Sequence, residues 1–536
     1  MEKRRFDFLW QYVNYWAVTD PNFTALRFED RAYSYGEFDD LTDKMATEFL
    51  NLGLKKGDMI ASMLPASPEY IMALVAADKI GVVVTALDVK YKTADLKKFI
   101  SHIQPKVVLA LAESEDFDIA GALKSVERNL NLDTPIQYFM IGQTEMGQPF
   151  ENLYHGLPEL ANELETRKAD QQLNDGLLVI FTGGTTGVPK AALLSKQNVV
   201  VMATIESEIL NGILVEQGID ERIKTIACLP PSHVGGTVEM ICSSIVSGSE
   251  TLIHDSWSPQ RVLETVQNEK IAWIGGVPTM YAIMLLLPDL DKYDLSSLKM
   301  AVLSGEKVEL ELLKLIKTKI CPSVMIGYGS TEAGSEVTFT QLSDAEEEIA
   351  DGYVGKALEG ADIRIVGEDG EVLSAGKSGE VQISGPLTIQ SYYKMPEEDS
   401  AGLTPDGYCK TGDLGYLTPE GGLYIKGRIK HIIRVGSYTV MPSEVEEVAV
   451  QHPSVGMAAA IGVPDKIYGE TVWLVVSPTP GETIDEEQLI AFCKKELAKY
   501  KVPKRVVVET ELPITRIGKV HRVEIQNRVI QSLKGE

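Results

Sequence analysis

Hydrophobic patterns typical of helices and of strands alternate along the chain as far as about residue 340, and this alternation most limits its possible folds. Ser34 and Glu37 have the spacing of a capping box, and apolar residues follow at steps of three and four. The pattern predicts a helix over 34–53, a strand over 59–64, a helix over 67–81 and a strand over 82–84. Such alternation indicates an α/β fold with a parallel sheet covered by helices.

The pattern changes after Gly352. Apolar and polar residues then alternate with a period of two, and Asp369 with Gly370 supplies a hairpin turn. From about Gly427 a compact α/β pattern begins. We therefore predict a large amino-terminal α/β domain with several subdomains over residues 1–427, of which about 350–427 are β-rich. A small, mobile carboxy-terminal α/β domain is predicted over residues 428–536.

Charge and cysteine content exclude several classes of protein. The 536 residues include 51 Lys and Arg against 77 Asp and Glu, a net charge of −26 that argues against nucleic-acid binding. Five scattered cysteines without a CxxC pair indicate neither a disulfide framework nor a zinc cluster, and they fit a reducing compartment. We find no signal peptide and no apolar run of the ~20 residues that span a bilayer. We therefore expect a cytoplasmic protein without a transmembrane segment.

The segment FTGGTTGVPK, residues 181–190, carries the strongest chemical signal. It follows an apolar strand and combines glycines, threonines and a lysine in one turn. Glycines allow backbone amides to approach phosphate oxygens, while the threonine hydroxyls and Lys190 add donors and charge. It is not a Walker loop, because Val188 and Pro189 separate Gly187 from the lysine. An ordinary glycine-rich turn is the alternative interpretation.

Three later motifs carry further candidate residues. In GYGSTEAG, residues 327–334, Glu332 occupies the place of the third glycine of a dinucleotide fingerprint, and its carboxylate suits a metal ion. Asp413, in YCKTGDLG, could accept hydrogen bonds from two ribose hydroxyls, and LPITRIGK places Lys519 in a glycine turn. Taken singly, Tyr328 and His233 could be core residues and Asp413 an ordinary turn residue.

In this order and spacing the motifs resemble those of the adenylate-forming superfamily, specifically its acyl-CoA synthetase branch. The resemblance covers nearly the whole chain. It implies two domains joined by a hinge near Lys430, with the active site between them. It also implies that Tyr328 stacks on adenine, Thr331 contacts the α-phosphate, Glu332 with Thr182 holds Mg²⁺, and Asp413 binds the ribose.

The remaining site residues follow from the same resemblance. The ATP-binding set is Thr182, Gly183, Gly184, Thr185, Thr186, Gly187, Lys190, Tyr328, Gly329, Thr331, Asp413, Arg428 and Lys519. The catalytic set is Lys519, Thr331, Glu332 and His233. The acyl pocket is assigned to His233, Val234, Gly235, Gly276, Gly305 and Gly327, and contacts with coenzyme A to Arg434 and Gly436.

The chain departs from its relatives at three places. Glu306 and Lys307 stand where many relatives carry small residues beside the acyl and adenine sites, which leaves the pocket shape open. Arg434 replaces a more usual lysine, and residues 191–192 are alanines where glycine is frequent. Amino-acid substrates are disfavoured because residues 228–241 contain no aspartate to meet an ammonium group, although Glu239 could do so.

We therefore predict an ATP-dependent acid–thiol ligase that uses ATP, Mg²⁺ and coenzyme A. Its small, mostly apolar pocket residues favour a hydrophobic carboxylic acid, fatty or otherwise bulky, which is activated as an acyl-adenylate and transferred to coenzyme A. AMP and pyrophosphate are released, and a homodimer is a candidate assembly. One alternative is an adenylating enzyme that passes an aryl or acyl group to a separate carrier protein or amine. A non-catalytic nucleotide-binding regulator is another, but Lys519 and Glu332 are both present.

Overall fold

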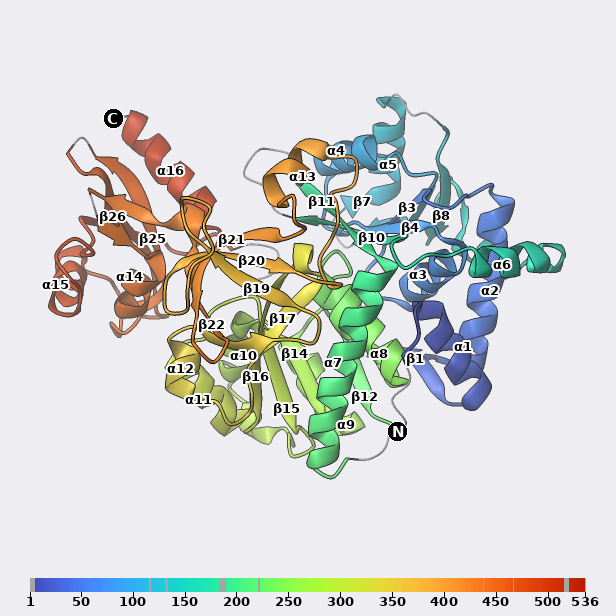
Figure 1. The fold of residues 1–536 in the computed structure, drawn as a ribbon, viewed down its shortest axis with the longest axis horizontal. Coiled ribbons are helices and arrows are strands. Elements are labelled where there is room, and N and C mark those ends of the chain that lie inside the picture. The colour runs from blue at the N-terminus through green and yellow to red at the C-terminus, as the bar shows by residue number, and fades with distance from the viewer. Residues whose placement is uncertain are drawn as a thin grey trace.

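The computed structural model describes residues 5–535, apart from residues 115–116, 131–133, 183–188, 220–221, 437, 466 and 515–519. Figure 1 shows a large unit, whose described strands form mainly three sheets with helices between and around them. A smaller unit, coloured orange to red, forms the carboxy-terminal end of the chain. This mixed α/β arrangement confirms the predicted fold class.

The first sheet is largely parallel, as the alternating pattern predicted. Its strands follow the order β11, β10, β4, β3, β5, β8 and β9, and only the β11–β10 pair is antiparallel among them. Their bounds are β3 (Met59–Met63), β4 (Val83–Ala86), β5 (Val107–Leu111), β8 (Gln137–Ile141), β9 (Gln148–Pro149), β10 (Gly176–Thr182) and β11 (Lys190–Ser195).

Local sequence signals define the helices beside this sheet. Ser34 caps α2 (Tyr35–Asn51), with its hydroxyl accepting the Glu37 amide at 3.3 Å while the Glu37 carboxylate accepts the Ser34 amide at 2.8 Å. Ser67 likewise caps α3 (Pro68–Ile80), which ends at Gly81 in the left-handed conformation, with φ of 74°. The capping box and both helices confirm the predictions made from the sequence.

A second sheet lies beside the first, and the long central helix lies near both. Its strands follow the order β12 (Lys224–Ala227), β13 (Glu250–Ile253), β1 (Thr24–Phe28) and β2 (Arg31–Ser34). Helix α7 (Lys196–Glu216) packs against α8 (Ser243–Ser247) and a π-helical segment, η3 (Gly235–Cys242). Among the described residues, α7 alone is long and apolar enough to cross a membrane, and most of its apolar window is buried inside the protein.

The third sheet joins the α/β part to the β-rich part of the chain. The strands β14 (Trp273–Gly276), β15 (Met300–Ser304) and β16 (Val324–Ser330) are parallel neighbours. The sheet continues, antiparallel, through β17 (Ser335–Phe339), β18 (Tyr353–Ala357), β22 (Gly422–Arg428), β21 (Cys409–Leu417), β20 (Gly379–Ser384) and β19 (Asp362–Val366). Residues on β16 and β21, far apart in the sequence, therefore belong to one sheet.

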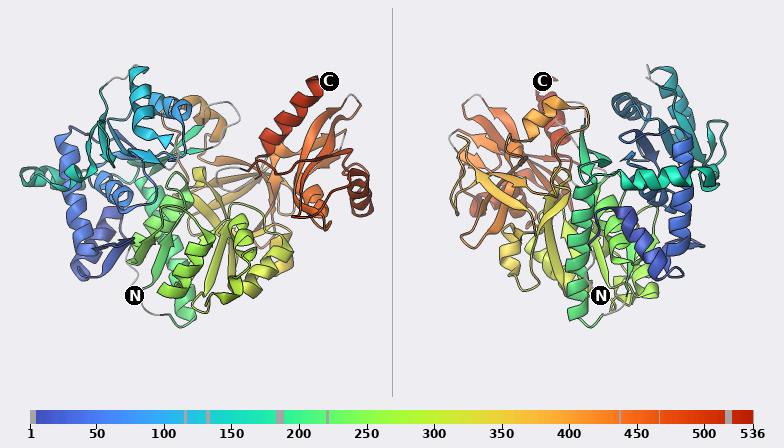
Figure 2. Two further views of the ribbon diagram at one scale, coloured as in Figure 1. Left: turned by 180° about the vertical axis from the view of Figure 1, so that it is seen from behind. Right: turned by 45° about the vertical axis from the view of Figure 1, so that its right-hand side comes forward.

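The other helices of the large unit surround these sheets in Figures 1 and 2. They are α1 (Leu9–Thr19), α4 (Thr93–Ile103), α5 (Ile119–Arg128), α6 (Ala161–Ala169), α9 (Pro259–Glu269), α10 (Pro278–Leu285), α11 (Leu310–Lys319), α12 (Glu346–Ala350) and α13 (Pro396–Gly402). Among them α9 precedes β14, α10 lies between β14 and β15, and α11 lies between β15 and β16.

The small unit has its own sheet and its own hydrophobic cores. Its strands are β23 (Ile433–Val435), β24 (Tyr438–Val440), β25 (Val455–Asp465), β26 (Gly469–Pro478) and β27 (Arg505–Val508). Its helices are α14 (Pro442–Ala449), α15 (Glu486–Glu496) and α16 (Arg522–Gly535). Both of its buried apolar clusters consist of residues from this unit alone, and Figure 2 shows it standing beside the large unit in both views.

A fully buried ion pair connects α3 with α7. The ammonium of Lys196, at the first position of α7, lies 2.5 Å from Oδ1 of Asp78, and both side chains have no exposed surface. Gln171 also accepts a hydrogen bond from this ammonium. Burial lowers the pKa of Lys196, whereas the Asp78 carboxylate acts against that shift. Each charge of the pair therefore stabilises the other against the cost of burial.

We expect Lys196→Met to lower the unfolding free energy of the large unit by about 3–5 kcal/mol, because the Asp78 carboxylate would remain buried without its cation. Urea unfolding followed by tryptophan fluorescence measures this change. Lys44→Met is the matched control, since Lys44 pairs with Asp40 on the exposed side of α2 and such pairs contribute below about 1 kcal/mol. Equal losses in the two variants would contradict the assignment.

Candidate functional site

Several of the predicted site residues lie at the carboxyl ends of the parallel strands. Tyr328 and Gly329 lie near the end of β16, Gly276 ends β14, and Gly305 follows β15. Because β14, β15 and β16 are parallel neighbours, their carboxyl ends meet at the same edge of the sheet. Ligands of α/β sheets bind at this kind of edge. The structure thus places these residues on one side of the third sheet.

Asp413 lies buried between an aromatic hydroxyl and a guanidinium. The Tyr328 hydroxyl donates to its Oδ2 at 2.8 Å, and Nε of Arg428 lies 2.8 Å from its Oδ1. Burial raises the pKa of Tyr328 well above its ordinary value and the Asp413 charge adds to the shift, so the phenol stays protonated as a donor. The structure therefore brings together the predicted adenine, ribose and second nucleotide contacts.

Glu332 and Thr182, the two predicted metal contacts, also come together. Glu332 lies in the short helix η5 (Thr331–Ala333), and its Oε1 accepts the Thr182 hydroxyl at 3.3 Å. Carboxylate and hydroxyl oxygens are hard donors that suit Mg²⁺, which usually keeps water and phosphate oxygens as its remaining ligands. Among the described residues, no group of three or more acidic, histidine or cysteine side chains is arranged to hold a metal ion by itself. The donor atoms of Glu332 and Thr182 suit a Mg²⁺ that is held jointly with a nucleotide.

Tyr392 is a contact of this site that the sequence analysis missed. Its hydroxyl donates to Oε1 of Glu332 at 3.2 Å, and the ammonium of Lys190 lies 5.2 Å from the centre of its ring. The backbone at Tyr392 pairs with Ala192 of β11, which brings it beside the end of the glycine-rich segment. The sequence offered only two adjacent tyrosines before a proline, among 20 tyrosines in the chain, as a signal.

Lys190 itself is paired with an acidic side chain. Its ammonium lies 2.7 Å from Oε2 of Glu398 on α13, so a phosphate must compete with this carboxylate for the lysine. Gly183 to Gly187 of the same segment lie outside the described residues, as does Lys519. Ala191 and Ala192, which replace frequent glycines, are fully buried and pack against the segment that carries Tyr392.

Three predicted acyl-pocket glycines have neighbours that leave little or no room for a side chain. A Cβ on Gly327 would come within 2.5 Å of Cγ of Glu336, and one on Gly276 within 3.1 Å of the Met280 sulfur. His233 and Val234 lie just before η3, and the His233 carbonyl accepts the Thr237 amide at 3.1 Å. A Cβ on Gly235, at the start of η3, would lie 3.3 Å from Cδ1 of Leu229 and 3.7 Å from the Glu239 carboxylate.

Glu239 belongs to a buried group of three carboxyls. The Ser335 hydroxyl contacts both Glu239 and Glu336, and the Ser243 hydroxyl donates to Glu206 at 2.7 Å. Burial, followed by the neighbouring Glu336 charge, raises the pKa of both Glu239 and Glu206 well above the ordinary value. Burial therefore disfavours the full negative charge that Glu239 would need to pair with an ammonium group.

Glu306 and Lys307, the unusual residues after β15, have partners of their own. Glu306 accepts a hydrogen bond from the Thr279 hydroxyl at 3.1 Å. Lys307 forms an ion pair with Glu447 on α14, which links the large unit to the small one. Lys307 thus takes part in the contact between the two units. No sequence pattern indicated that Glu447 would be its partner.

The predicted hinge and coenzyme A residues lie where the two units meet. Lys430 is in the short helix η6 (Ile429–His431), and burial followed by the charge of Arg428 lowers its pKa. Arg434 contacts Glu368 at 3.3 Å through two largely exposed side chains. Gly436 has φ of 63° and donates its amide to the Tyr468 carbonyl at 2.7 Å. A positive φ favours glycine at this position.

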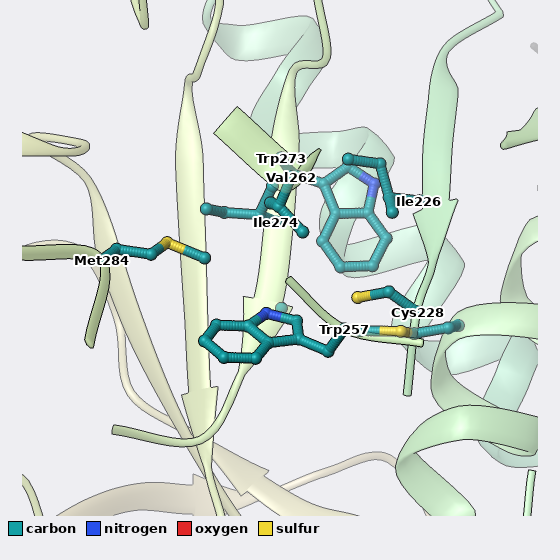
Figure 3. A pocket seen from close by; sticks show the side chains of 9 residues that line it. Ile226, Cys228, Trp257, Val262, Trp273, Ile274 and Met284 are labelled. Carbon is teal, nitrogen blue, oxygen red and sulfur yellow. The ribbon is translucent and has the colours of Figure 1, made fainter. Parts of the chain in front are cut away.

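An apolar cavity lies beside the acyl-pocket segments. It is enclosed by η3, β12, β14, α9 and α10, and Figure 3 shows Trp257 and Trp273 on two sides of it with Met284 at another. The other side chains include Ile226, Cys228, Met240, Val262 and Ile274. Since η3 and β14 also carry Gly235 and Gly276, the cavity continues the region assigned to the acyl group.

Comparison with known proteins gives consistent matches along the chain. The family model described as AMP-binding enzyme matches residues 13–393, and that of the AMP-binding enzyme C-terminal domain matches residues 444–519. An indoleacetate–CoA ligase from Aromatoleum aromaticum is 29% identical, covering 97% of this chain and 98% of its own. A long-chain-fatty-acid–CoA ligase from Bacillus subtilis is 30% identical, with coverages of 94% and 92%.

A solved structure shows the same overall fold. The o-succinylbenzoate coenzyme A synthetase from Bacillus subtilis, in complex with ATP and magnesium, superposes with a TM-score of 0.79. It is 25% identical, and the match covers 96% of this chain and 98% of that one. The likeness therefore extends over both the large and the small unit.

We expect Asp413→Ala to weaken ATP binding about tenfold or more, because a buried carboxylate that accepts charged or polar hydrogen bonds is removed. Isothermal calorimetry measures the affinity, and circular dichroism checks that the variant is folded. Asp406→Ala is the matched control, since Asp406 forms an exposed ion pair with Arg364 in the same β-rich part. Unchanged ATP affinity in folded Asp413→Ala would contradict the assignment.

We expect Tyr392→Phe to raise about tenfold the Mg²⁺ concentration that gives half-maximal pyrophosphate release, because the phenol no longer fixes the Glu332 carboxylate. Titration with Mg²⁺ at saturating ATP measures this shift. Tyr393→Phe is the control, because the Tyr393 ring packs against His102. The hydrogen bond between these two residues uses the backbone carbonyl of Tyr393, which the substitution keeps. A Mg²⁺ dependence equal to the control's would show that Tyr392 does not position Glu332.

Proposed function

Because the chain belongs to the family of AMP-binding enzymes, we propose that it activates a hydrophobic carboxylic acid with ATP and transfers the acyl group to coenzyme A. In general terms the chain is an AMP-forming acyl-CoA synthetase, with ATP and coenzyme A as substrates. The hydrophobic nature of the acid is the proposed part. A cytoplasmic location and a homodimeric assembly stay predictions of the sequence.

The apolar cavity between η3 and β14 is the observation that carries the proposed acid class. Hydrocarbon, thioether, thiol and indole side chains line it. Burial raises the pKa of Glu239 and so disfavours a negative charge there that would attract a cationic acyl group. Each methylene transferred from water into such a site contributes about 0.8 kcal/mol. An apolar acyl body is therefore favoured over acetate or a free amino acid.

The residues of the site can prepare a carboxylate for attack. A carboxylate is a poor acyl donor, and joining it to AMP supplies a better leaving group. We assign Asp413, Arg428 and Tyr328 to holding the nucleoside, and Glu332 with Thr182 to holding Mg²⁺, which would neutralise phosphate charge. Once Lys190 no longer pairs with Glu398, its ammonium would stabilise the departing pyrophosphate. Positioning and charge neutralisation suffice, so no protein nucleophile is required.

The second half-reaction would use a different arrangement of the two units. We propose that Lys519 bridges the carboxylate and the α-phosphate during adenylation, and that rotation about Lys430 then brings Arg434 and Gly436 toward coenzyme A. Two ion pairs between the units, Lys307–Glu447 and Arg434–Glu368, have partly or largely exposed partners. Exposed pairs contribute little free energy, so they can break when the small unit turns.

The decisive experiment measures pyrophosphate, AMP and acyl-CoA together, with and without coenzyme A, over a panel of aliphatic and aromatic acids. We expect coenzyme A-dependent AMP release with a hydrophobic acid, and rates well below this with acetate or glycine. AMP release with a carrier protein or an amine, and none with coenzyme A, would instead support acyl transfer to another acceptor. Absence of pyrophosphate formation with every acid would contradict the proposed function.

We expect Lys519→Ala to slow adenylate formation about 10²–10³-fold, because a charge that stabilises the developing negative charge is lost. The same variant should convert a supplied acyl-adenylate to acyl-CoA at a near-normal rate. Lys430→Pro should do the opposite, because proline fixes φ and stiffens the hinge. Assaying each half-reaction separately tests both variants, and equal losses in both steps for Lys519→Ala would disprove the rotation.

A further inference from the structure

We propose that Trp273 forms the inner end of the acyl-binding site and restricts the enzyme to acids with a compact apolar body. The body would extend no more than about 10 Å along β14. This inference rests on the proposed function, because it concerns the acid that the same site accepts. It goes further by naming the side chain that sets the limit.

Trp273 separates two cavities. It lines the apolar cavity between η3 and β14, and it also lines a second cavity on the side of α7 and α8. It is the residue shared by the two linings, and only 5% of its surface is exposed. In Figure 3 its indole lies between Ile226 and Ile274, across the first cavity from Trp257. The indole therefore forms a wall between the two spaces.

The length of β14 gives the depth of the site. Gly276, an acyl-pocket residue, ends the strand at the edge where the site residues gather, whereas Trp273 begins it. Three residues of strand span about 10 Å. A Cβ on Gly275 would lie 3.3 Å from Cζ3 of Trp273 and 3.8 Å from Cε of Met240. The indole thus lies alongside the strand, next to Gly275 and on the same face of the strand.

The side chains of the first cavity differ in how easily they can move. The ligand-free cavity has a volume of about 10 Å³, the room of roughly one water molecule, so an acyl group must displace side chains to enter. Met240 and Met284 are unbranched and flexible, which makes them easy to displace. Trp273 is a rigid, bulky ring packed on both sides. An entering acyl group therefore moves the methionines and stops at the indole.

The second cavity lies among residues that carry polar groups, several of which form hydrogen bonds with one another. Six of its side chains carry a hydroxyl or an amide group: Ser207, Asn211, Thr225, Ser243, Ser244 and Ser247. Thr225 and Ser244 share a hydrogen bond of 2.7 Å, and Ser243 donates to Glu206 at 2.7 Å. An alkyl chain that passed Trp273 would have to desolvate or separate these groups, which is costly. Trp273 thus separates the first cavity from a region in which an alkyl chain would disturb hydrogen-bonded hydroxyls.

These observations identify the substrate class as compact apolar acids, which include medium-length alkanoic acids and acids with one ring on a short linker. A long straight chain exceeds the available depth. Whether the body is an aromatic ring or an alkyl chain is decided by comparing 3-phenylpropanoate with octanoate. The shared requirement is an apolar body that ends before Trp273.

The test compares kcat/KM for acyl-CoA formation from butanoate, hexanoate, octanoate, dodecanoate and palmitate, with 3-phenylpropanoate added. For the unaltered enzyme we expect a rise of about fourfold for each methylene up to a medium length, and then a steep fall. Trp273→Ala should move the maximum to a longer acid, because it removes the wall. Gly275→Ala should move it to a shorter acid, because the added methyl group crowds the channel in front of Trp273.

Trp473→Ala is the matched control, because it truncates a partly buried tryptophan in β26 of the small unit. It should keep the unaltered preference for acid length. If Trp273→Ala does not fold, Trp273→Leu replaces it, and a thermal melt identifies the folded variants. A best rate with palmitate in the unaltered enzyme, or an unshifted maximum in folded Trp273 and Gly275 variants, would overturn the inference. Absence of acyl-CoA from every acid would instead count against the proposed function.

Discussion

The buried carboxylate of Asp413 is the constraint on which the arrangement of the site depends. A charge that is 4% exposed must find partners, and here Tyr328 and Arg428 supply them at 2.8 Å each. Tyr328 comes from β16 of the α/β part, whereas Asp413 and Arg428 face each other on β21 and β22. One hydrogen bond therefore fixes the parallel and antiparallel halves of the third sheet at the point where nucleotide contacts are predicted.

Local features of the sequence predicted what depends on neighbouring residues. The Ser34–Glu37 capping box, the helix after Ser67 and the strands beside them agree with the structure, because caps and turns act within a few residues. Tyr392 and its bond to Glu332 could not be predicted in this way, since 60 residues separate the two. The Lys307–Glu447 contact joins residues 140 apart, on different units. Such pairs exist only once the sheets are assembled.

The surroundings of Glu239 show a second limit of reasoning from residue type. Its position beside the acyl-pocket segments suggested a partner for an ammonium group. Burial, followed by the charge of the neighbouring Glu336, instead raises the pKa of Glu239, so a negative charge on this carboxyl is disfavoured. The sequence identified the residue but could not show its surroundings. The same burial makes the region beside η3 more suitable for an uncharged acyl group.

Basic residues close to the site explain how a strongly acidic protein can bind two anionic substrates. A net charge of −26 repels ATP and a carboxylate at long range, but salt screens such fields beyond about 8 Å. Close to the site, the charges of Arg428 and Lys190 both lower the pKa of Lys430, so the three cations repel one another there. A bound phosphate would relieve that repulsion. It would also replace the Glu398 carboxylate as the ion-pair partner of Lys190. The three cations thus repel one another when no phosphate is bound, and the same three charges favour nucleotide binding.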